Sequence, residues 1–356
     1  MTPGARITRL IEKRGPITFA RFMREALYGP GGYYQSGTPV GRDFHTAPRV
    51  SPLFGKLMAE AVRRVGGDVT TLVEFGAGSG HLAAPMLSAL PERLRYFGIE
   101  PGASARSELR ARLRPFGRRA EVCVKFPDRT FRGTGIVIAN ELFDALPCHR
   151  VVGTSAGLAE LYVGRSRDGR FVGVRGKPST SKLERQLRAE GIRLRRGQKA
   201  EVCLEAAGVY RAVERAFRRC VLIAVDYGYE AEELYSPLRH GGTIRGYFRH
   251  RESDDLLAGP GEQDMTYHVD LTHLRLTASR YGFKTQWNIS QGKFLLGLGA
   301  LEMMRGVTME ERLSLKTLLM PGGMGDRFTV LVQVKGMSLS PSWCPSLEEL
   351  AEKGEG

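Results

Sequence analysis

The glycine-rich segment VEFGAGSGHL, residues 73–82, constrains the fold of this 356-residue chain more than any other stretch. An apolar run leads into it and a helix-like pattern follows, which predicts a strand over 70–76, a tight turn and a helix over 81–90. The first glycine allows the main chain to turn sharply off the strand, and the next two allow it to approach a ligand closely. The segment therefore predicts a strand, a binding loop and a helix in direct succession.

The rest of the chain repeats this alternation of strands and helices. A charged helix is predicted over 103–114, and further strands are predicted over 96–100, 121–126, 135–140, 221–228 and 328–334. Alternating segments of this kind imply a parallel sheet with helices on both faces, so the predicted fold class is α/β.

Four parts of the chain are distinguished by composition. They are a mainly helical N-terminal cap (1–65) with a Gly/Pro-rich break at 28–35, a core domain (66–335), two inserts within that domain (about 150–218 and 236–270) and a C-terminal tail (336–356). The first insert is expected to hold a hairpin-like pair, 158–164 and 170–176, followed by an Arg-rich helix. Inserts of this kind lie above the strand ends, where α/β folds bind ligands, and are interpreted as lids.

Composition narrows the class of protein and its compartment. Hydrophobic residues make up 42% and charged residues 26%, no apolar run approaches the length of a membrane span, and no secretory signal is seen. The five scattered cysteines fit reduced thiols, so a cytoplasmic location is expected, or the mitochondrial matrix for a eukaryotic chain. The net charge of +15, with arginines clustered at 106–119 and 185–219, is interpreted as solvated helix faces rather than a nucleic-acid footprint, because no nucleic-acid-binding motif accompanies it. The sequence gives no indication of oligomeric state.

The spacing of the loop glycines indicates which cofactor it binds. Gly76, Gly78 and Gly80 form a GxGxG pattern, whereas a dinucleotide fingerprint needs its third glycine at position 81, where this chain has His81. A strand ending in E-x-G-x-G-x-G is instead similar to the loop of class I S-adenosylmethionine methyltransferases. In that pattern, Glu74 is expected to hold the loop or to reach the methionine ammonium of the cofactor.

A second carboxylate is expected at the end of the next strand. Glu100 ends the strand predicted over 96–100 and stands 20 residues after Gly80, where nucleotide-binding folds place an acid on the ribose hydroxyls. This position supports nucleoside binding without selecting the cofactor. The alternative is a tight turn with an exposed glutamate after it.

The segment ANELFDALP, residues 139–147, places acids at the end of a buried strand. Asn140, Glu141 and Asp144 follow the apolar run 135–138. Carboxylates at the mouth of a hydrophobic sheet must be solvated, paired or used to bind a cation. They are interpreted here as a site, and the alternative is that they cap the start of a helix.

Several segments in order resemble the MidA-type methyltransferases, a family that includes the mitochondrial arginine methyltransferase needed for assembly of respiratory complex I. The resemblance spans about residues 16–335 and rests on GRDFHTAP (41–48), SPLFG (51–55), NELFDALP (140–147), VDYGY (225–229), QDMTYHVD (263–270), FLLGLGA (294–300) and MGDRFTVL (324–331). It implies a Rossmann-like class I methyltransferase sheet, S-adenosyl-L-methionine as methyl donor and a protein arginine as acceptor. Ala77 and Arg42 depart from the proline and glycine usual in the family.

The resemblance also suggests roles for further residues. Asp43 and Thr46 would close over the cofactor, although an Asx-type turn at Asp43 would look the same. Glu141 and Asp144 would clamp the planar guanidinium of the acceptor.

Polar residues later in the chain leave alternatives open. Asp226 either lines the acceptor pocket or holds the loop after it. In the polar group of Asp264, His268 and Asp270, the histidine is a proton shuttle or a hydrogen-bonded loop residue. Histidines and acids are too scattered to indicate a metal site. Methylation of RNA or of a small molecule, and a non-catalytic assembly chaperone on the same fold, remain as alternative functions.

Overall fold

The computed structural model describes residues 1–36, 46–248 and 251–345. Its largest sheet consists of β2 (Val69–Phe75), β3 (Arg95–Ile99), β4 (Ala120–Cys123), β5 (Thr134–Asn140), β10 (Arg219–Tyr229), β15 (Lys284–Ser290) and β16 (Phe328–Lys335), with β14 (Val269–Asp270) beside the end of β10. The strands lie in the order β4-β3-β2-β5-β10-β16-β15. The predicted α/β fold class is confirmed, and the sequence analysis missed β15.

The sheet is mixed, which corrects the expectation of a purely parallel one. Neighbouring strands from β4 to β10 are parallel, but β16 runs antiparallel to both β10 and β15. The reason is the connection 291–327, which is helical: Ser290, at the end of β15, pairs with Thr329, near the start of β16, so this connection leaves and returns at one edge of the sheet.

The strand order reverses between β2 and β5. The chain passes from β2 outward through β3 and β4, and then returns to β5 on the other side of β2. The carboxyl ends of β2 and β5 therefore diverge into loops that leave a crevice between them, the usual ligand site of an open α/β sheet. The glycine loop follows β2, and the predicted acids follow β5.

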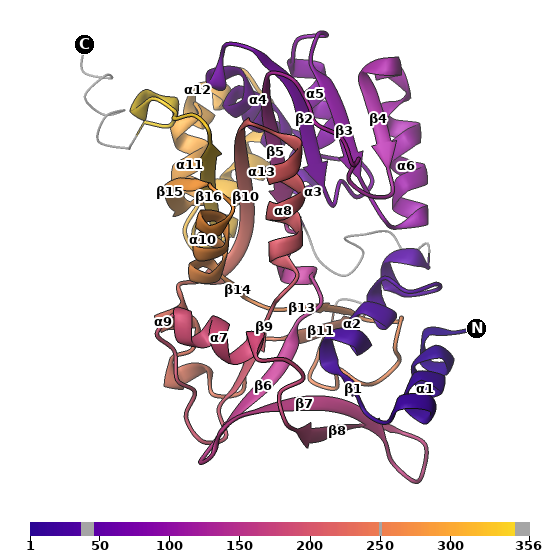
Figure 1. Cartoon of the computed structure of the whole chain (residues 1–356). Helices are drawn as coiled ribbons and strands as arrows, with labels where there is room; N and C mark the ends of the chain where they lie inside the picture. Colours follow the sequence, from indigo (N-terminus) through magenta and orange to yellow (C-terminus); the bar gives the residue numbers. More distant parts are fainter. Residues whose placement is uncertain (37–45, 249–250, 346–356) are drawn as a thin grey trace.

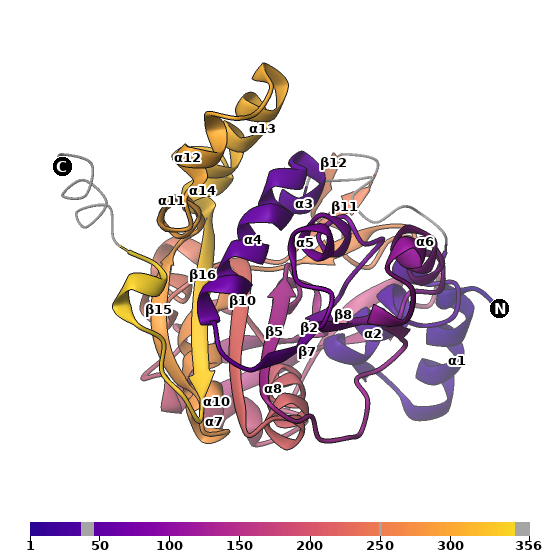
Figure 2. The same cartoon turned by 90° about the horizontal axis from the view of Figure 1, so that it is seen from above.

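Helices cover both faces of the sheet because alternate strand residues point to opposite sides. In β5, Ile136 and Ile138 belong to one hydrophobic core, and Val137 and Ala139 belong to the other. The first core is closed by α4 (Pro52–Val65), α5 (Ala83–Ala89), α6 (Ala103–Leu113), α11 (Gln291–Gly297) and α13 (Met309–Leu319), and the second by α8 (Ala206–Ala216) and α10 (Leu271–Arg280). Figure 2 shows α13 extending away from the body of the molecule.

The first insert forms a second sheet below the central one (Figure 1). It contains β6 (His149–Thr154), β7 (Gly157–Arg165), β8 (Phe171–Gly176) and β9 (Lys199–Val202). The helix α7 (Lys182–Ala189) lies between β8 and β9 in the chain. The predicted hairpin-like pair is confirmed, because β7 and β8 pair antiparallel. The second insert holds a small sheet of β11 (Arg245–Phe248), β12 (Arg251–Ser253) and β13 (Asp264–Thr266), which the sequence analysis did not predict.

The helices of the first 65 residues divide between these layers. α1 (Pro3–Arg14) and α2 (Phe19–Leu27) lie beside the second sheet, to which β1 (Ile17–Thr18) adds a strand by pairing with β7. α3 (Ala47–Val50) and α4 pack instead on the central sheet.

Among the described residues, no helix is both long and apolar enough to cross a bilayer. The short helices α9 (Ala231–Leu234), α12 (Ala300–Met304) and α14 (Met324–Arg327) complete the set.

Candidate active site

A cavity of about 300 Å³ lies where β2 and β5 end. It is lined by most of the predicted site residues, namely Thr46, Glu74, Gly76, Ala77, Gly78, Glu100, Asn140, Glu141 and Asp144. Gly80, Asp226 and His268 are not among the lining residues, and Asp43 lies outside the described ranges. Folding thus brings together two segments that are about 60 residues apart in the sequence.

The glycine loop after β2 forms one wall of this cavity. The amides of Gly76 and Ala77 both donate to the carbonyl of Ile99, which ties the loop to the end of β3. Gly76 and Gly78 have φ values of +67° and +52°, a conformation that favours glycine. A Cβ at Gly78 would meet no atom within 4 Å, so the main chain there faces open space, as expected for close approach of a ligand.

Gly80 has a different role from the one predicted. A Cβ at this position would lie 2.8 Å from Leu109 and 3.2 Å from Arg112, both in α6. The third glycine therefore permits close packing of the loop against a helix rather than close approach to a ligand.

Glu100 connects the loop to the start of α6. Its Oε2 accepts a hydrogen bond from the Gly78 amide (2.8 Å), and its Oε1 accepts one from the Gly102 amide (2.6 Å). Burial raises the pKa of this carboxyl, while the two amide hydrogen bonds oppose the rise. Each oxygen has a second lone pair, so the carboxylate can still accept from the hydroxyls of a ribose.

Glu74 is buried beneath the loop and also lines the cavity. It accepts a hydrogen bond from the Tyr96 hydroxyl at 2.7 Å, and burial raises the pKa of its carboxyl to about 8. A cationic group placed here would favour the ionised form and lower this pKa. The position fits the predicted contact with a methionine ammonium.

Glu141 forms the opposite wall and adopts an uncommon backbone conformation. Its φ is +51°, and no other non-glycine residue in the described part of the chain has a positive φ. Its amide donates to the carbonyl of Val225 in β10 (2.8 Å), which holds this conformation in place. Strained backbone of this kind is concentrated at functional sites, because the surrounding structure must offset its cost.

The Glu141 side chain lies among polar groups that do not neutralise it. Its Oε1 accepts from the Ala47 amide (3.3 Å) and from Nδ2 of Asn140 (3.2 Å). Burial, with the nearby Asp144 carboxylate as a second cause, raises the Glu141 pKa to about 8. The buried Oδ1 of Asn140 has no hydrogen-bond partner among the described residues.

Asp144 lies in the short helical turn Phe143–Ala145 and is buried. Its Oδ1 also lacks a hydrogen-bond partner among the described residues. Burial raises the pKa of the Asp144 carboxyl to about 6, and a hydrogen bond with the Tyr227 side chain opposes the rise. Two unpartnered acceptors, Asn140 Oδ1 and Asp144 Oδ1, therefore lie in residues that line one cavity. Buried polar atoms without partners are rare in native proteins and indicate a missing donor.

Asp226 holds this turn instead of lining the cavity. Its Oδ2 accepts from the amides of Phe143 (2.8 Å) and Asp144 (3.4 Å), and its Oδ1 accepts from the Tyr227 amide (3.0 Å). Asp226 thus differs from both predicted roles, because it neither lines the cavity nor holds the loop after it but fixes the turn that follows β5.

His268 lies outside the cavity lining. Its ring packs against Tyr227 and Tyr229, with centroids 5.4 and 5.2 Å apart, and burial lowers its pKa to about 4. A neutral imidazole wedged between two tyrosines is poorly placed to exchange protons with the cavity. The packing therefore favours the interpretation of His268 as a loop residue.

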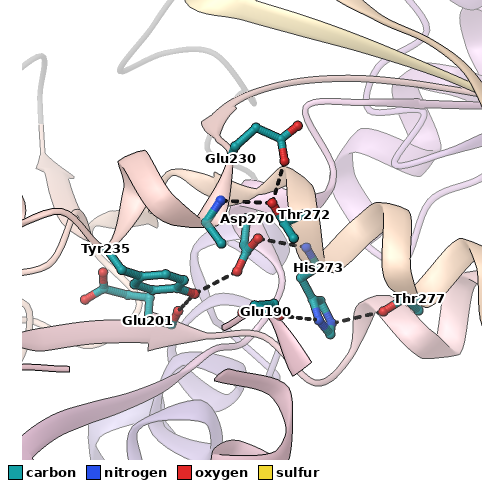
Figure 3. Close-up of polar contacts among 9 residues, drawn as sticks. Glu190, Glu201, Glu230, Tyr235, Asp270, Thr272, His273 and Thr277 are labelled. Carbon is teal, nitrogen blue, oxygen red and sulfur yellow. Dashed lines mark hydrogen bonds and ion pairs between the residues drawn. The ribbon is translucent and has the colours of Figure 1, made fainter. Parts of the chain in front are cut away.

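Asp270, the last of the predicted polar group, belongs to a separate buried network (Figure 3). It caps α10 by accepting from the His273 amide (2.8 Å) and also accepts from the Tyr235 hydroxyl (2.9 Å). His273 in turn contacts Glu190 of the first insert, with Nδ1 and Oε1 3.1 Å apart. This network joins α10 to the first insert.

The sequence analysis missed two aromatic residues of the site. Tyr28 and Tyr34 line the cavity, with ring centroids 5.2 Å apart. The hydroxyl of Tyr34 donates to Asp264 (2.7 Å), which places that predicted polar residue behind the aromatic pair. The segment 28–35 was interpreted only as a helix break, and its tyrosines were the available signal.

Part of the arginine cluster at 106–119 also has a structural explanation. Arg106 donates to the carbonyl of Glu100 (2.9 Å), and Arg112 donates to that of Ser79 (2.8 Å). These side chains attach α6 to the glycine loop and to the end of β3.

Comparison with known proteins agrees with this geometry. A family model described as "Putative S-adenosyl-L-methionine-dependent methyltransferase" matches residues 53–289, about two thirds of the chain. The chain belongs to this methyltransferase family. S-adenosyl-L-methionine is its cofactor, and the open face of Gly78, the ribose-competent Glu100 and the buried Glu74 fit this molecule.

Individual relatives extend over most of the chain. The mitochondrial protein arginine methyltransferase NDUFAF7 of Danio rerio is 28% identical over 88% of this chain and 82% of its own, and that of Mus musculus is 30% identical over 75% and 67%. A Burkholderia thailandensis crystal structure bound to S-adenosyl-homocysteine is 27% identical, with a TM-score of 0.85, and covers 97% of this chain and 95% of its own. The methyltransferase has the Rossmann-like class I fold of these neighbours.

Proposed function

We propose that this methyltransferase transfers a methyl group to an arginine side chain of a partner protein. The observation that carries the proposal is the pair of unpartnered buried acceptors, Asp144 Oδ1 and Asn140 Oδ1, beside the Glu141 carboxylate at the cofactor cavity. A guanidinium is planar and has five N–H donors, so one arginine can donate to all three residues.

The charges of the site also favour a cationic acceptor. The raised pKa values of Glu141 and Asp144 show that two buried carboxylates without a cation are costly, and a guanidinium between them would remove that cost. Bound S-adenosyl-L-methionine supplies the methyl group. Glu141 and Asp144 would hold the guanidinium so that its positive charge is localised away from the attacking nitrogen.

Glu141 can serve further as the proton acceptor of the reaction. A guanidinium nitrogen that gains a methyl group must lose a proton, and the Glu141 carboxylate beside it is positioned to accept that proton.

The identity of the acceptor is proposed from the relatives. Several are named mitochondrial protein arginine methyltransferases, which supports a protein arginine as acceptor. The family resemblance supports a respiratory complex I subunit, or an intermediate of its assembly, as that protein. A cytoplasmic location is proposed because the five cysteines are unpaired thiols.

The proposal is tested in a lysate of source cells that lack the enzyme. Tritiated S-adenosyl-L-methionine and the purified enzyme are added to this lysate. We expect the label in protein, and acid hydrolysis should release it as methylarginine. An Asp144→Asn sample should incorporate much less label. Label in lysine, RNA or a small metabolite would contradict the proposal, and an Asp144→Asn variant that supports assembly without transferring methyl groups would favour a chaperone role.

A further inference from the structure

The acid turn, Phe143–Ala145, depends on distant parts of the chain for its position. The Tyr28 hydroxyl, at the end of α2, donates to the carbonyl of Ala145 at 2.8 Å. The Tyr267 hydroxyl, in the second insert, donates to the carbonyl of Phe143 at 2.9 Å, and the Tyr267 amide donates to that of Asp144 at 3.2 Å. The three carbonyls of the turn therefore accept hydrogen bonds from two tyrosine residues.

These contacts complement those of Asp226 on the other side of the turn. Asp226 accepts from the turn amides of Phe143 and Asp144, whereas the tyrosines donate to its carbonyls. A three-residue turn has almost no hydrogen-bond ladder of its own, so its position is set by these external partners. Tyr267 is only 3% exposed, and water cannot readily replace its hydroxyl.

We propose that Tyr28 and Tyr267 are positioning residues that fix the direction of the Asp144 carboxylate toward the acceptor. The inference rests on the proposed role of Asp144 as an arginine-binding acid. It gives the N-terminal segment and the second insert a common role, because together with β10 they assemble the acceptor side of the cavity. The glycine loop, with Glu74 and Glu100, forms the cofactor side.

The test compares single hydroxyl deletions. Tyr28→Phe and Tyr267→Phe should each lower the rate of tritium transfer into lysate protein about tenfold at saturating cofactor, as expected for one lost buried hydrogen bond. Calorimetric affinity for S-adenosylhomocysteine should stay at the wild-type value. Tyr210→Phe is the matched control, because it keeps the ring that stacks on Phe143 (centroids 6.2 Å apart) and removes only a buried hydroxyl that donates to Gln333 (2.7 Å) rather than to the turn. It should retain the full rate.

Double variants with Asp144→Asn separate the possible outcomes. If the tyrosines act through Asp144, then removing either hydroxyl in the Asp144→Asn background should cause no further loss of rate. Single tyrosine variants with full activity beside an impaired Asp144→Asn would overturn the inference and leave the proposed function intact. A fully active Asp144→Asn would instead refute the proposed function. A Tyr28→Phe loss that persists in the double variant would show that Tyr28 contacts the acceptor directly, which also overturns the inference.

Discussion

Two clusters of buried acids in this methyltransferase have similar surroundings and different roles. In both, burial raises carboxyl pKa values: to about 8 for Glu141 at the cavity, and to about 7 for Glu190 and Asp270 in the network of Figure 3. In the network, both Asp270 oxygens have donors, and Glu190 and Asp270 share a hydrogen bond. The network adjoins only about 10 Å³ of free space.

Unpartnered oxygens occur in both clusters, Asp144 Oδ1 at the cavity and Glu190 Oε2 and Glu201 Oε1 in the network, so what sets the cavity acids apart is the space of about 300 Å³ beside them. A perturbed pKa therefore does not distinguish a reactive acid from a structural one in this protein. The combination of an unpartnered acceptor and an open cavity sets Asp144 apart, because the cavity has room for a ligand that donates to it.

The largest expected effect concerns the cavity itself. Gly78→Val places a branched side chain at a φ of +52°, in the space where the loop faces the cofactor. We expect affinity for S-adenosylhomocysteine to fall by more than about a hundredfold, since the strain and the clash together exceed about 2.7 kcal/mol. Gly173→Val, at an open position with ordinary φ in β8, is the control and should bind normally by calorimetry. Equal affinity in the two variants would remove the loop from the cofactor site.

The second prediction exchanges one acid of each cluster for its neutral amide. Glu141→Gln should lower the single-turnover methylation rate at least about a hundredfold, because roughly 2.7 kcal/mol of charge-assisted stabilisation is lost. Its cofactor affinity and melting temperature should stay near wild type. Glu190→Gln, which resembles the protonated acid, should transfer methyl groups normally. Normal turnover in Glu141→Gln would show that Glu141, like Glu190, supports the structure and takes no part in methyl transfer.

Two different quantities should change with pH in opposite directions. The methylation rate, which depends on Glu141, should rise with pH, and the stability contributed by Glu190 should fall. Methyl transfer needs ionised Glu141, so kcat/KM for the acceptor should rise about tenfold per pH unit below pH 8 and level off above it. Stability should fall over the lower part of this range. The folded protein favours protonated Glu190, so its contribution is present below the unfolded pKa of about 4.5 and is lost as the pH rises through about 7. Melting curves of wild type and Glu190→Gln at pH 5 and 8 measure this difference. If the melting temperature of the wild type falls no more between pH 5 and 8 than that of Glu190→Gln, the protonated state assigned to Glu190 is contradicted.

The smallest expected effect tests the network as a structural joint. Asp270→Ala removes the cap of α10 and should lower the free energy of unfolding by about 1–2 kcal/mol, as measured by urea denaturation. Turnover at saturating substrates should not change. Asp168→Ala, which breaks an exposed ion pair with Arg170 and an exposed hydrogen bond from Ser166, should leave the free energy of unfolding close to the wild-type value. A large loss of turnover in Asp270→Ala with little loss of stability would extend the catalytic region into the network.

Local sequence predicted the parts of the site that depend on short-range chemistry. The glycines after β2 and the acids after β5 are recognisable because left-handed turns require glycine and because charged residues are unusual after a buried strand. Their meeting followed from the α/β alternation, which places the carboxyl ends of parallel strands at one edge. The roles of Gly80, Asp226 and His268 were not predictable in this way, since each depends on a partner far away in the sequence.

The sequence by itself determined the fold class, the cofactor loop and the position of the two acids along the chain. The loop and the acids are each encoded within about ten residues, and the fold class follows from the alternation of strands and helices along the chain. Only the tertiary structure decided which of the buried acids lie beside an open cavity. Asp144 and Asp270 are both buried aspartates beside short apolar runs, and nothing in their neighbouring residues separates them. Asp270 receives the Tyr235 hydroxyl and the first turn of α10, whereas Asp144 Oδ1 receives no donor among the described residues and lies in a residue that lines the cavity. Hydrogen-bond satisfaction is a property of the packed three-dimensional neighbourhood, and so it appears only once the chain has folded.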